Sequence, residues 1–509
     1  MVPRVTSKAR QWLLLAALPW VAATARADQE LIMAWEAEPR SLDPRYAVDA
    51  NSQYLEDLLH CSLISFDRDG QISPSLAENW RWVTPTTLKL SLRRNIKFAD
   101  GAEVEAKDVV ATFQHFLRPD TKAPRRSAFK NLRAVVADSD HEVTMTVASP
   151  DASFVANLAV GVLPVALADG PMITDKTNVA GCGPFTLVSS SSQSTVLKPN
   201  TNWGFGPPPK IPGVVIKIVK DENTRYAKLI AGELDLIQNS ISRDKLKVLG
   251  KDRPDLKIVS RPGLNTAYLG FNVRNATLAN SLVRRAIAHA IDKDKIVKYV
   301  LSGMAINADT LITATSPFHA SAIAVPNYDP AESRRLLDQA GFPEVGDKPR
   351  FHLSYKTTTD QTRIIVAKAI AADLRKVGIA TKVETLEWGR FKADVDHGRV
   401  ELWGLSWVGF KDPDIYRFAF ATSSIPPNGG NRGWFSVPAL DQLLTAGMME
   451  TDQTKRELIY KDVQRIIGLE APYAFLWHED VFAVVSQKVS GFEVYADGRL
   501  SSLARVQKN

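Results

Sequence analysis

The sequence predicts an α/β protein that has more than one β-sheet and at least two lobes. The chain has 509 residues, and a single hydrophobic core stops growing at roughly 250–300 residues. Of these residues 45% are hydrophobic and 23% are charged, which is the composition of a globular protein. Segments with the period of a strand alternate with segments that have the period of a helix, as in α/β folds.

The first 27 residues predict an export signal. A start that carries only basic charges precedes a short apolar run over residues 13–23, and Ala25-Arg26-Ala27 has small residues at the cleavage positions. The run is too short to span a bilayer comfortably. We therefore expect a signal peptide over residues 1–27, cleavage after Ala27 and an exported mature chain.

The charge of the mature chain argues against a nucleic-acid partner. Residues 1–27 carry four of the 63 basic residues and no acidic one, so 59 basic residues remain against 56 acidic ones, a net charge of +3. Nucleic-acid-binding proteins concentrate far more positive charge.

Three strands and a helix are expected in the N-terminal half. Apolar residues alternate with polar ones over residues 88–92, 143–147 and 214–218, the period of half-buried strands. Between the first two strands, residues 108–117 have the apolar spacing of a helix that packs on a sheet.

A helix with clear end signals is expected in the C-terminal half. Asp329 is placed to cap its start, Pro330 suits the first helical position and Glu332 is placed to close a capping box. Gly341 follows the last turn, where a left-handed residue commonly ends a helix.

Two more helices and a strand are expected after it. Apolar stripes over residues 364–377 and 459–467 predict helices that end at Gly378 and Gly468. Residues 382–386 have strand character, which continues the alternation of helices and strands.

Two cysteines exclude a disulfide-rich scaffold and a cysteine-rich zinc module. Because the chain is exported, Cys61 and Cys182 are permitted to form a disulfide. Two free, buried thiols are the alternative.

Nothing in the sequence predicts a catalytic centre. A phosphate-binding loop and a dinucleotide-binding fingerprint are both absent. The eight histidines do not pair at the spacing of a helical metal site. We therefore predict no cofactor, no metal and no enzymatic activity.

Aromatic residues are concentrated in one region, where glycines interleave with them. Trp and Tyr give a large rigid contact area with a polar edge, which suits a ligand cavity. The alternative is that they fill the core of a lobe, and we favour the binding site. The cluster consists of Trp388, Trp403, Trp407, Phe410, Tyr416, Phe418, Phe420, Trp434 and Phe435.

Several stretches, in order along nearly the whole mature chain, resemble the solute-binding proteins of peptide-type ABC importers, the dipeptide- and oligopeptide-binding group of family 5. They include LKLSLRRNIKFADGAEVEAKDVVATF, GCGPFTL, LGFNVRNATLANSLVRRAIAHAIDKDKIVKYVLSGMA, YDPAESRRLLDQAGFP and LSWVGFKDPD. Relatives usually have a small or hydroxyl residue in place of Cys182.

The resemblance implies the α/β, two-lobed fold of a periplasmic binding protein (type II, cluster C-like) with an extra subdomain inserted in lobe I. Lobe I would comprise residues 28–269, with the insert at about residues 60–180, and would be completed by residues 478–509. Lobe II would comprise residues 270–477.

The resemblance also implies the function. A monomer in the periplasm would capture a peptide or peptide-like solute between the lobes and deliver it to a membrane permease. A non-peptide ligand on the same scaffold, such as an opine, a sugar, a nickel chelate or haem, is the first alternative. A secreted hydrolase is the second.

Site residues follow from matching positions. In oligopeptide-binding relatives two tryptophans line the pocket, and these match Trp388 and Trp407. An Asp shortly after Trp-x-Gly receives the ligand's α-amino group in peptide-binding relatives, whereas this chain has Phe410 after Gly409. Either Asp412 or Asp414 takes over that role, or the ligand has no free amine there.

Two cations are candidate partners for an anionic group of the ligand. Lys356 lies near the position where relatives place the partner of the ligand's carboxylate, and Arg432 lies within GGNRGW. The alternative for both residues is that they are solvated charges on the protein surface.

Overall fold

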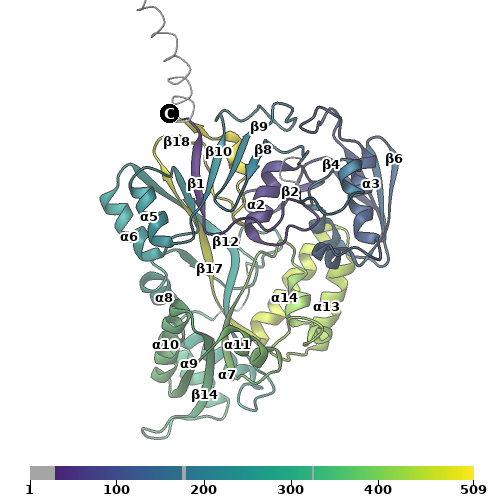
Figure 1. Cartoon of the computed structure of the whole chain (residues 1–509). Helices are drawn as coiled ribbons and strands as arrows, with labels where there is room; N and C mark the ends of the chain where they lie inside the picture. Colours follow the sequence, from purple (N-terminus) through teal and green to yellow (C-terminus); the bar gives the residue numbers. More distant parts are fainter. Residues whose placement is uncertain (1–28, 175–178, 322, 324–325) are drawn as a thin grey trace, which may run out of the picture.

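The computed structural model describes residues 29–174, 179–321, 323 and 326–509. The predicted signal peptide and the cleavage site after Ala27 lie outside these residues. The described chain forms two lobes, one of which holds the N-terminal half and the C-terminal tail (Figure 1). No helix in the described ranges combines the length and the apolar character needed to cross a membrane.

One large sheet runs through both lobes in the order β15-β14-β16-β12-β17-β11-β1-β10-β9-β8, with β13 beside β17. Its strands are β1 (Leu31–Trp35), β8 (Phe185–Ser190), β9 (Ser194–Pro199), β10 (Val214–Ile218), β11 (Leu236–Gln238), β12 (Leu256–Phe271), β13 (Ala305–Asn307), β14 (Phe351–Thr358), β15 (Ile379–Leu386), β16 (Leu402–Trp407) and β17 (Tyr473–Ser486). The strands predicted over residues 214–218 and 382–386 are confirmed as β10 and most of β15.

The two longest strands, β12 and β17, join the lobes. They pair antiparallel from Leu256 opposite Ser486 to Gly270 opposite Tyr473, and the register shifts between Pro262 and Thr266. Because β11 extends the sheet on one side and β16 on the other, each lobe builds outward from this shared pair.

A second sheet forms the core of a separate unit in the N-terminal lobe. Its order is β4 (Ala77–Thr84), β5 (Thr87–Leu92), β7 (Glu142–Val147) and β6 (Leu132–Ser139), and α3 (Ala106–Gln114) packs on it. The strands predicted over residues 88–92 and 143–147 are β5 and β7, and every second residue of each is buried as the alternation predicts.

The two cysteines form a disulfide that closes the ends of this unit. Cys61 and Cys182 have Cα atoms 5.1 Å apart, and both are buried beside the core of the second sheet. The bond therefore ties the chain segment that enters the unit to the segment that leaves it.

The remaining elements cover the faces of the large sheet or form small two-stranded sheets. The helices of the N-terminal lobe are α2 (Ala50–Leu59), α4 (Val165–Ala168), α5 (Glu222–Ile230) and α6 (Arg243–Asp252). Those of the other lobe are α7 (Ser281–Ala290), α8 (Lys293–Tyr299), α9 (Pro330–Gln339), α10 (Gln361–Lys376), α11 (Trp388–Asp396), α12 (Ile415–Phe420), α13 (Pro438–Met449) and α14 (Gln453–Glu470). β2 (Ile64–Phe66) forms a hairpin with β3 (Ile72–Pro74), and β18 (Val489–Ser490) forms a two-stranded sheet with β19 (Gln507–Lys508).

The start of α9 differs from the prediction in one respect. The side chain of Asp329 accepts hydrogen bonds from the backbone N–H groups of Ala331 and Glu332, as expected of a cap. Glu332 does not close a capping box, because the backbone N–H of Asp329 donates to the carbonyl of His289 instead. Glu332 forms an ion pair with Arg335.

The predicted end of α14 at Gly468 is wrong, since the helix continues to Glu470 and ends at Ala471, which has a φ of 46°. The buried Arg284 donates hydrogen bonds to the carbonyl groups of Glu470 and Ala471. These hydrogen bonds from α7 satisfy carbonyl groups in the last turn of α14, which would otherwise lack an intrahelical partner. The sequence alone predicts that a glycine, Gly468, ends the helix.

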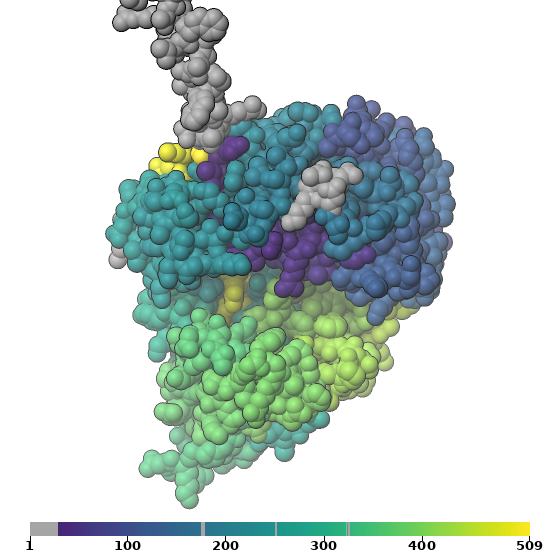
Figure 2. Space-filling model, in the orientation of Figure 1, coloured from purple at the N-terminus to yellow at the C-terminus, as the bar shows by residue number. Residues whose placement is uncertain are grey.

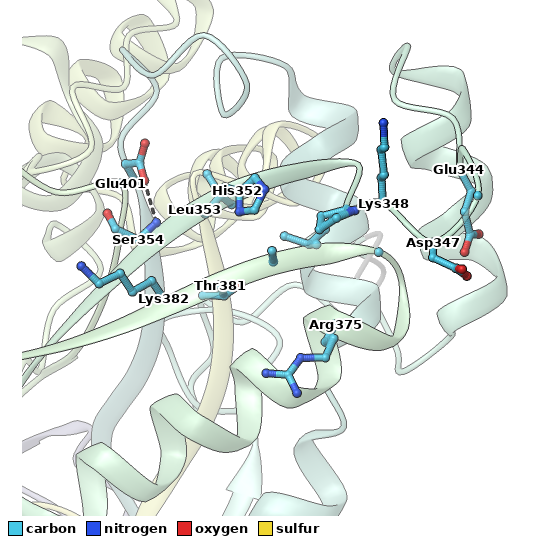
Figure 3. Close-up of a pocket in the computed structure, with 15 residues that line it drawn as sticks. Glu344, Asp347, Lys348, His352, Leu353, Ser354, Arg375, Thr381, Lys382 and Glu401 are labelled. Carbon is cyan, nitrogen blue, oxygen red and sulfur yellow. Dashed lines mark hydrogen bonds between the residues drawn. The ribbon is translucent and has the colours of Figure 1, made fainter.

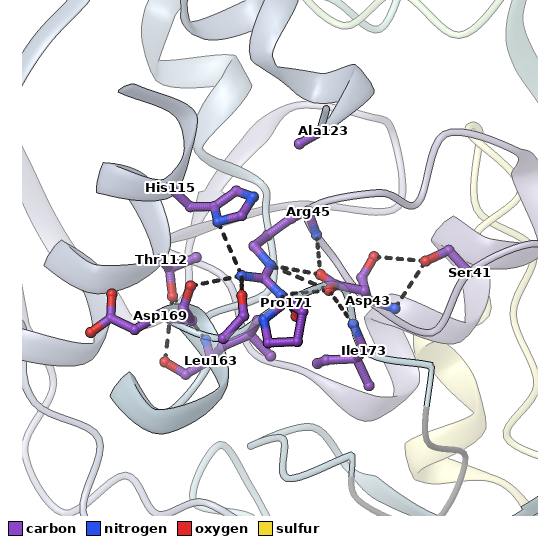
Figure 4. Close-up of polar contacts among 12 residues, drawn as sticks. Ser41, Asp43, Arg45, Thr112, His115, Ala123, Leu163, Asp169, Pro171 and Ile173 are labelled. Carbon is purple, nitrogen blue, oxygen red and sulfur yellow. Dashed lines mark hydrogen bonds and ion pairs between the residues drawn. The ribbon is translucent and has the colours of Figure 1, made fainter. Parts of the chain in front are cut away.

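A buried ion pair fixes the loop between β1 and α2 (Figure 4). Arg45 and Asp43 are fully buried with 2.7 Å between guanidinium and carboxylate, and Arg45 also donates to the carbonyl of Ala168 at 2.7 Å. Nδ1 of His115 lies 3.2 Å from the guanidinium. Burial, assisted by the charge of Arg45, lowers the pKa of His115, so a neutral ring accepts this hydrogen bond.

Candidate functional site

The strand β16 has an open edge next to the junction of the lobes. All six of its residues pair with β12, but only Leu402 and Trp403 pair with β14 on the other side. Within the described residues, the backbone from Gly404 to Trp407 therefore has no neighbouring strand on the β14 side. An open edge of this kind is able to pair with an extended chain.

A cavity of about 60 Å³ lies beside this edge. It sits at the carboxyl ends of the parallel strands β14 and β16 and at the first turn of α10, where ligands of α/β sheets commonly bind. It is lined by Ala267, Tyr268, Leu301, Tyr355, Thr357, Thr362, Arg363, Val366, Gly404, Leu405, Ser406, Leu476, Trp477 and Glu479.

Three polar side chains of this cavity, Arg363, Thr357 and Trp477, are able to donate hydrogen bonds to a ligand. Nη1 of Arg363 lies 3.5 Å from the carbonyl of Gly404, and no carboxylate of the described residues forms an ion pair with Arg363. Thr357 and Trp477 are 1% and 3% exposed, yet the Thr357 hydroxyl and the Trp477 Nε1 have no hydrogen-bond partner within the described chain. Buried donors beside a guanidinium suit a carboxylate.

Glu479 is the acidic residue of the lining. Its carboxylate lies 3.9 Å from the guanidinium of Arg243 on α6. Glu479 on β17 therefore has a cation of α6 as its ion-pair partner, and it does not pair with Arg363 in the described structure.

The predicted tryptophans occupy three different environments. Trp403 is fully buried, and a Cβ atom at Gly270 would lie only 2.3 Å from its ring, so this side chain belongs to the packed core. Trp407 is 9% exposed and stacks on Tyr268 with 6.1 Å between ring centroids. Trp388 begins α11, is 52% exposed and has Phe391 as its aromatic neighbour in the described chain.

The structure therefore brings Trp403 and Trp407 into one aromatic cluster, against which Phe410 also packs, and leaves Trp388 outside it. A role of Trp388, Trp407 or Phe410 in binding stays a prediction. The full burial of Trp403 favours the alternative considered from the sequence, in which an aromatic residue fills the lobe core.

The two candidate amine acceptors are both held by arginines of this chain. The carboxylate of Asp412 accepts hydrogen bonds from Nη1 and Nη2 of Arg456 at 2.8 and 2.7 Å. Asp414 accepts from Nε of Arg417 at 2.9 Å and from the hydroxyl of Tyr460 at 3.3 Å. Burial raises the pKa of Asp414 and Arg417 opposes this shift. Neither carboxylate is left for a ligand amine in this arrangement.

The two candidate cations are engaged as well. Nζ of Lys356 lies 3.0 Å from Asp394 and donates to the carbonyl of Arg399 at 2.7 Å. Arg432 forms an ion pair with Asp396 at 2.9 Å. The guanidinium of Arg432 also lies 5.3 Å from the ring centroid of Trp407, a cation–π distance.

Sequence reasoning missed Arg363, the cation in the lining of this cavity, which has no acidic partner among the described residues. The signal was present in the sequence. Asp360 caps α10 and accepts from the backbone N–H of Arg363, directly after the strand that ends at Thr358. A cation in the first turn of a helix that follows a parallel strand lies at the carboxyl end of the sheet.

A larger, open pocket of about 930 Å³ lies elsewhere on this lobe (Figure 3). It is at the amino ends of β14 and β15, the opposite end of these strands from Arg363. Its charged side chains, which include Glu344, Lys348 and Lys382, have both signs and spread around a wide rim. This position and this mixture of charges make it the weaker candidate for a small solute.

The space between the lobes is visible on one face of the molecule. Figure 2 shows a hollow between the N-terminal lobe and the green lobe, with C-terminal residues coloured yellow at its floor. On the other flank the lobes touch, since α13 contacts the 3₁₀ turn at Ala152–Leu158 of the inserted unit.

Comparisons with known proteins agree with this architecture. Residues 71–427 match the family described as bacterial extracellular solute-binding proteins, family 5. The chain is 30% identical over 505 residues to a glutathione-binding protein of Pectobacterium atrosepticum, and the match covers 96% of each chain. It is 28% identical to a dipeptide-binding protein of Pseudomonas aeruginosa, over 92% of this chain and 93% of the relative.

A solved structure has the same fold. The structure of HbpA2 from Haemophilus parasuis superposes with a TM-score of 0.83 at 24% identity, covering 94% of this chain and all of the other. The chain therefore belongs to family 5 of the bacterial extracellular solute-binding proteins.

Proposed function

We propose that this chain is the periplasmic binding component of an ABC importer, and that it captures a short peptide or peptide-like solute between its lobes. The observation that carries the proposal is the open edge of β16 from Gly404 to Trp407, which ends at the cavity that contains Arg363. An extended ligand backbone pairs with the edge, and its carboxylate meets the guanidinium.

The length of the edge sets the length of the ligand. Three steps from Gly404 to Trp407 span about 10 Å at a strand rise of about 3.3 Å per residue. That length suits a peptide of two or three residues. The names of the glutathione- and dipeptide-binding relatives support a ligand of this size.

Transport requires binding and release without a chemical step. Residues 28–269 with 478–509 form lobe I, residues 270–477 form lobe II, and the insert occupies about residues 60–180. The lobes close about β12 and β17, and a monomer in this closed form is recognised by a membrane permease. The solute leaves unchanged, so the chain is not an enzyme.

Titration calorimetry with free tripeptides and their C-terminal amides tests this proposal. Free peptides are expected to bind, and the amides at least ten-fold more weakly, because a charge-assisted hydrogen bond is lost. Mass spectrometry of the recovered peptide is expected to show no change. Binding of a sugar, an opine, a nickel chelate or haem, with no response to any peptide, would overturn it.

A further inference from the structure

The loop that follows β16 reaches from lobe II into lobe I. Nζ of Lys411 lies 2.7 Å from the carboxylate of Asp497 in the C-terminal tail, and 3.9 Å from the ring centroid of Phe66 in β2. The backbone N–H of Gly409 donates to Oδ1 of Asn265 at 3.1 Å, which holds the loop against β12. Lys411 is therefore fixed at the junction of the lobes, four residues beyond the open edge.

The surroundings of Lys411 in lobe I have the chemistry of an ammonium site. Asp497 and Phe66 are buried, and a carboxylate with an aromatic face is the usual recognition pair for an ammonium group. Arg499 contacts both Asp497, at 2.8 Å, and Asp57, at 3.7 Å. The carboxylates of Asp57 and Asp497 thus face the cations Arg499 and Lys411. The charges of this cluster cancel only while Lys411 is in place.

The protonation state of Asp497 agrees with this arrangement. Burial by itself would raise the pKa of this carboxyl, but Arg499 and Lys411 outweigh burial and hold its pKa at about 2. Asp497 is therefore ionised at neutral pH, and its negative charge is the partner of the Lys411 ammonium group.

Asp412 and Asp414, the two acids in the described loop after β16, are not open to a ligand amine. Asp412 is held by Arg456 and Asp414 by Arg417. Phe410, the residue before Lys411, offers an apolar side chain at this end of the site. A ligand that buried a free ammonium there would leave it unpaired, which is costly.

We propose that Lys411 is a specificity-determining residue. Its own ammonium group fills the place beside Asp497 and Phe66 that a ligand's ammonium group would otherwise take, so the site selects ligands that have no free amine beyond Trp407. N-acylated peptides and other amine-blocked, peptide-like carboxylates are the class of ligand that fits. The proposal rests on the proposed function, because the β16 edge and Arg363 set the direction of the ligand.

The test compares tri-alanine with N-acetyl-tri-alanine by titration calorimetry on the wild-type protein. The acetylated peptide is expected to bind at least ten-fold more tightly. In Lys411→Met the carboxylate of Asp497 becomes available, and the preference is expected to shrink at least ten-fold or to reverse. Lys382→Met, which removes an exposed lysine of the edge strand β15, is the matched control and is expected to keep the wild-type preference.

The outcomes separate the two proposals. Tighter binding of the free peptide to the wild type overturns the role of Lys411 but leaves the peptide-binding function standing. Failure of both peptides to bind overturns both. The wild-type comparison decides the matter even if Lys411→Met does not fold, which circular dichroism would show.

Discussion

Arg456 on α14 holds both carboxylate oxygens of Asp412, the residue that follows Lys411 in the loop after β16. The two side chains are 7% and 14% exposed. This ion pair joins the loop to the helical layer of lobe II. Asp412 was a sequence candidate for binding a ligand's amine, but in the structure its carboxylate is bound by Arg456.

Arg456→Met is expected to lower the free energy of unfolding by about 3–5 kcal/mol, because it leaves Asp412 as a nearly buried charge without a partner. Urea denaturation followed by circular dichroism measures this change. Arg465→Met on the same helix removes an exposed partner of Asp462 and is expected to cost less than about 0.5 kcal/mol. Equal effects of the two substitutions would contradict the structural role of Arg456.

Reduction of the Cys61–Cys182 disulfide is expected to destabilise the protein by about 2–5 kcal/mol, because the bond closes a loop between residues 121 apart in sequence. Thermal melting with and without reductant measures the effect. The double variant Cys61→Ala, Cys182→Ala serves as control, since its melting temperature should not respond to reductant. A melting temperature of the wild type that is the same with and without reductant would contradict the prediction.

Arg363→Met is expected to weaken binding of a free tripeptide by about 10- to 100-fold, the equivalent of one charge-assisted interaction of about 1.5–3 kcal/mol. The C-terminal amide of the same peptide should be affected much less, and calorimetry with both ligands separates the two effects. Arg375→Met, in the last turn of the same helix, removes an exposed guanidinium that lines the larger pocket at the opposite end of β14. Loss of affinity in Arg375→Met instead would place the carboxylate elsewhere.

The stability of the protein is expected to fall by about 2 kcal/mol through His478 alone between pH 7 and pH 5. His478 is 2% exposed, its Nδ1 lies 3.0 Å from the hydroxyl of Thr266, and burial lowers its pKa from 6.5 to about 4. Asp309 opposes this shift, whereas His319 and Lys293 add to it.

The sign follows from where the proton binds. The unfolded chain takes up a proton below about pH 6.5, whereas the folded chain resists it down to about pH 4, so the stability present above pH 6.5 is lost as the pH falls. His478→Asn keeps a donor near Nδ1 and does not titrate. A free energy of unfolding that depends on pH equally in His478→Asn and the wild type would contradict the assignment.

The regular elements were largely predictable because their signals are local. The alternation that predicted strands over residues 88–92 and 143–147 reflects which side chains face the core, and both strands form with that burial. The helix ends were less predictable. Gly378 has the expected left-handed conformation. The helix α14, in contrast, continues beyond Gly468, and the carbonyl groups at its end accept hydrogen bonds from Arg284 of α7, which is distant in sequence.

The candidate site was predictable only as a region. The aromatic cluster drew attention to β16 and the loop after it, but the sequence did not distinguish the packed Trp403 from the half-exposed Trp388. Lys356 and Arg432 matched the expected chemistry of an anion site, yet acids of α11 engage both. Arg363, without an acidic partner in the described part of the chain, was missed.

The sequence by itself determined the α/β class, the two-lobed family fold and the absence of recognisable catalytic motifs, since periodicity and motif order are properties of the chain. Only the tertiary structure decided which charges are available to a ligand. Asp412 and Arg456 are 44 residues apart, and Lys411 meets Asp497 only because the C-terminal tail returns to lobe I. The energy of a buried charge depends on neighbours in space, and these are set by the packing of the whole molecule.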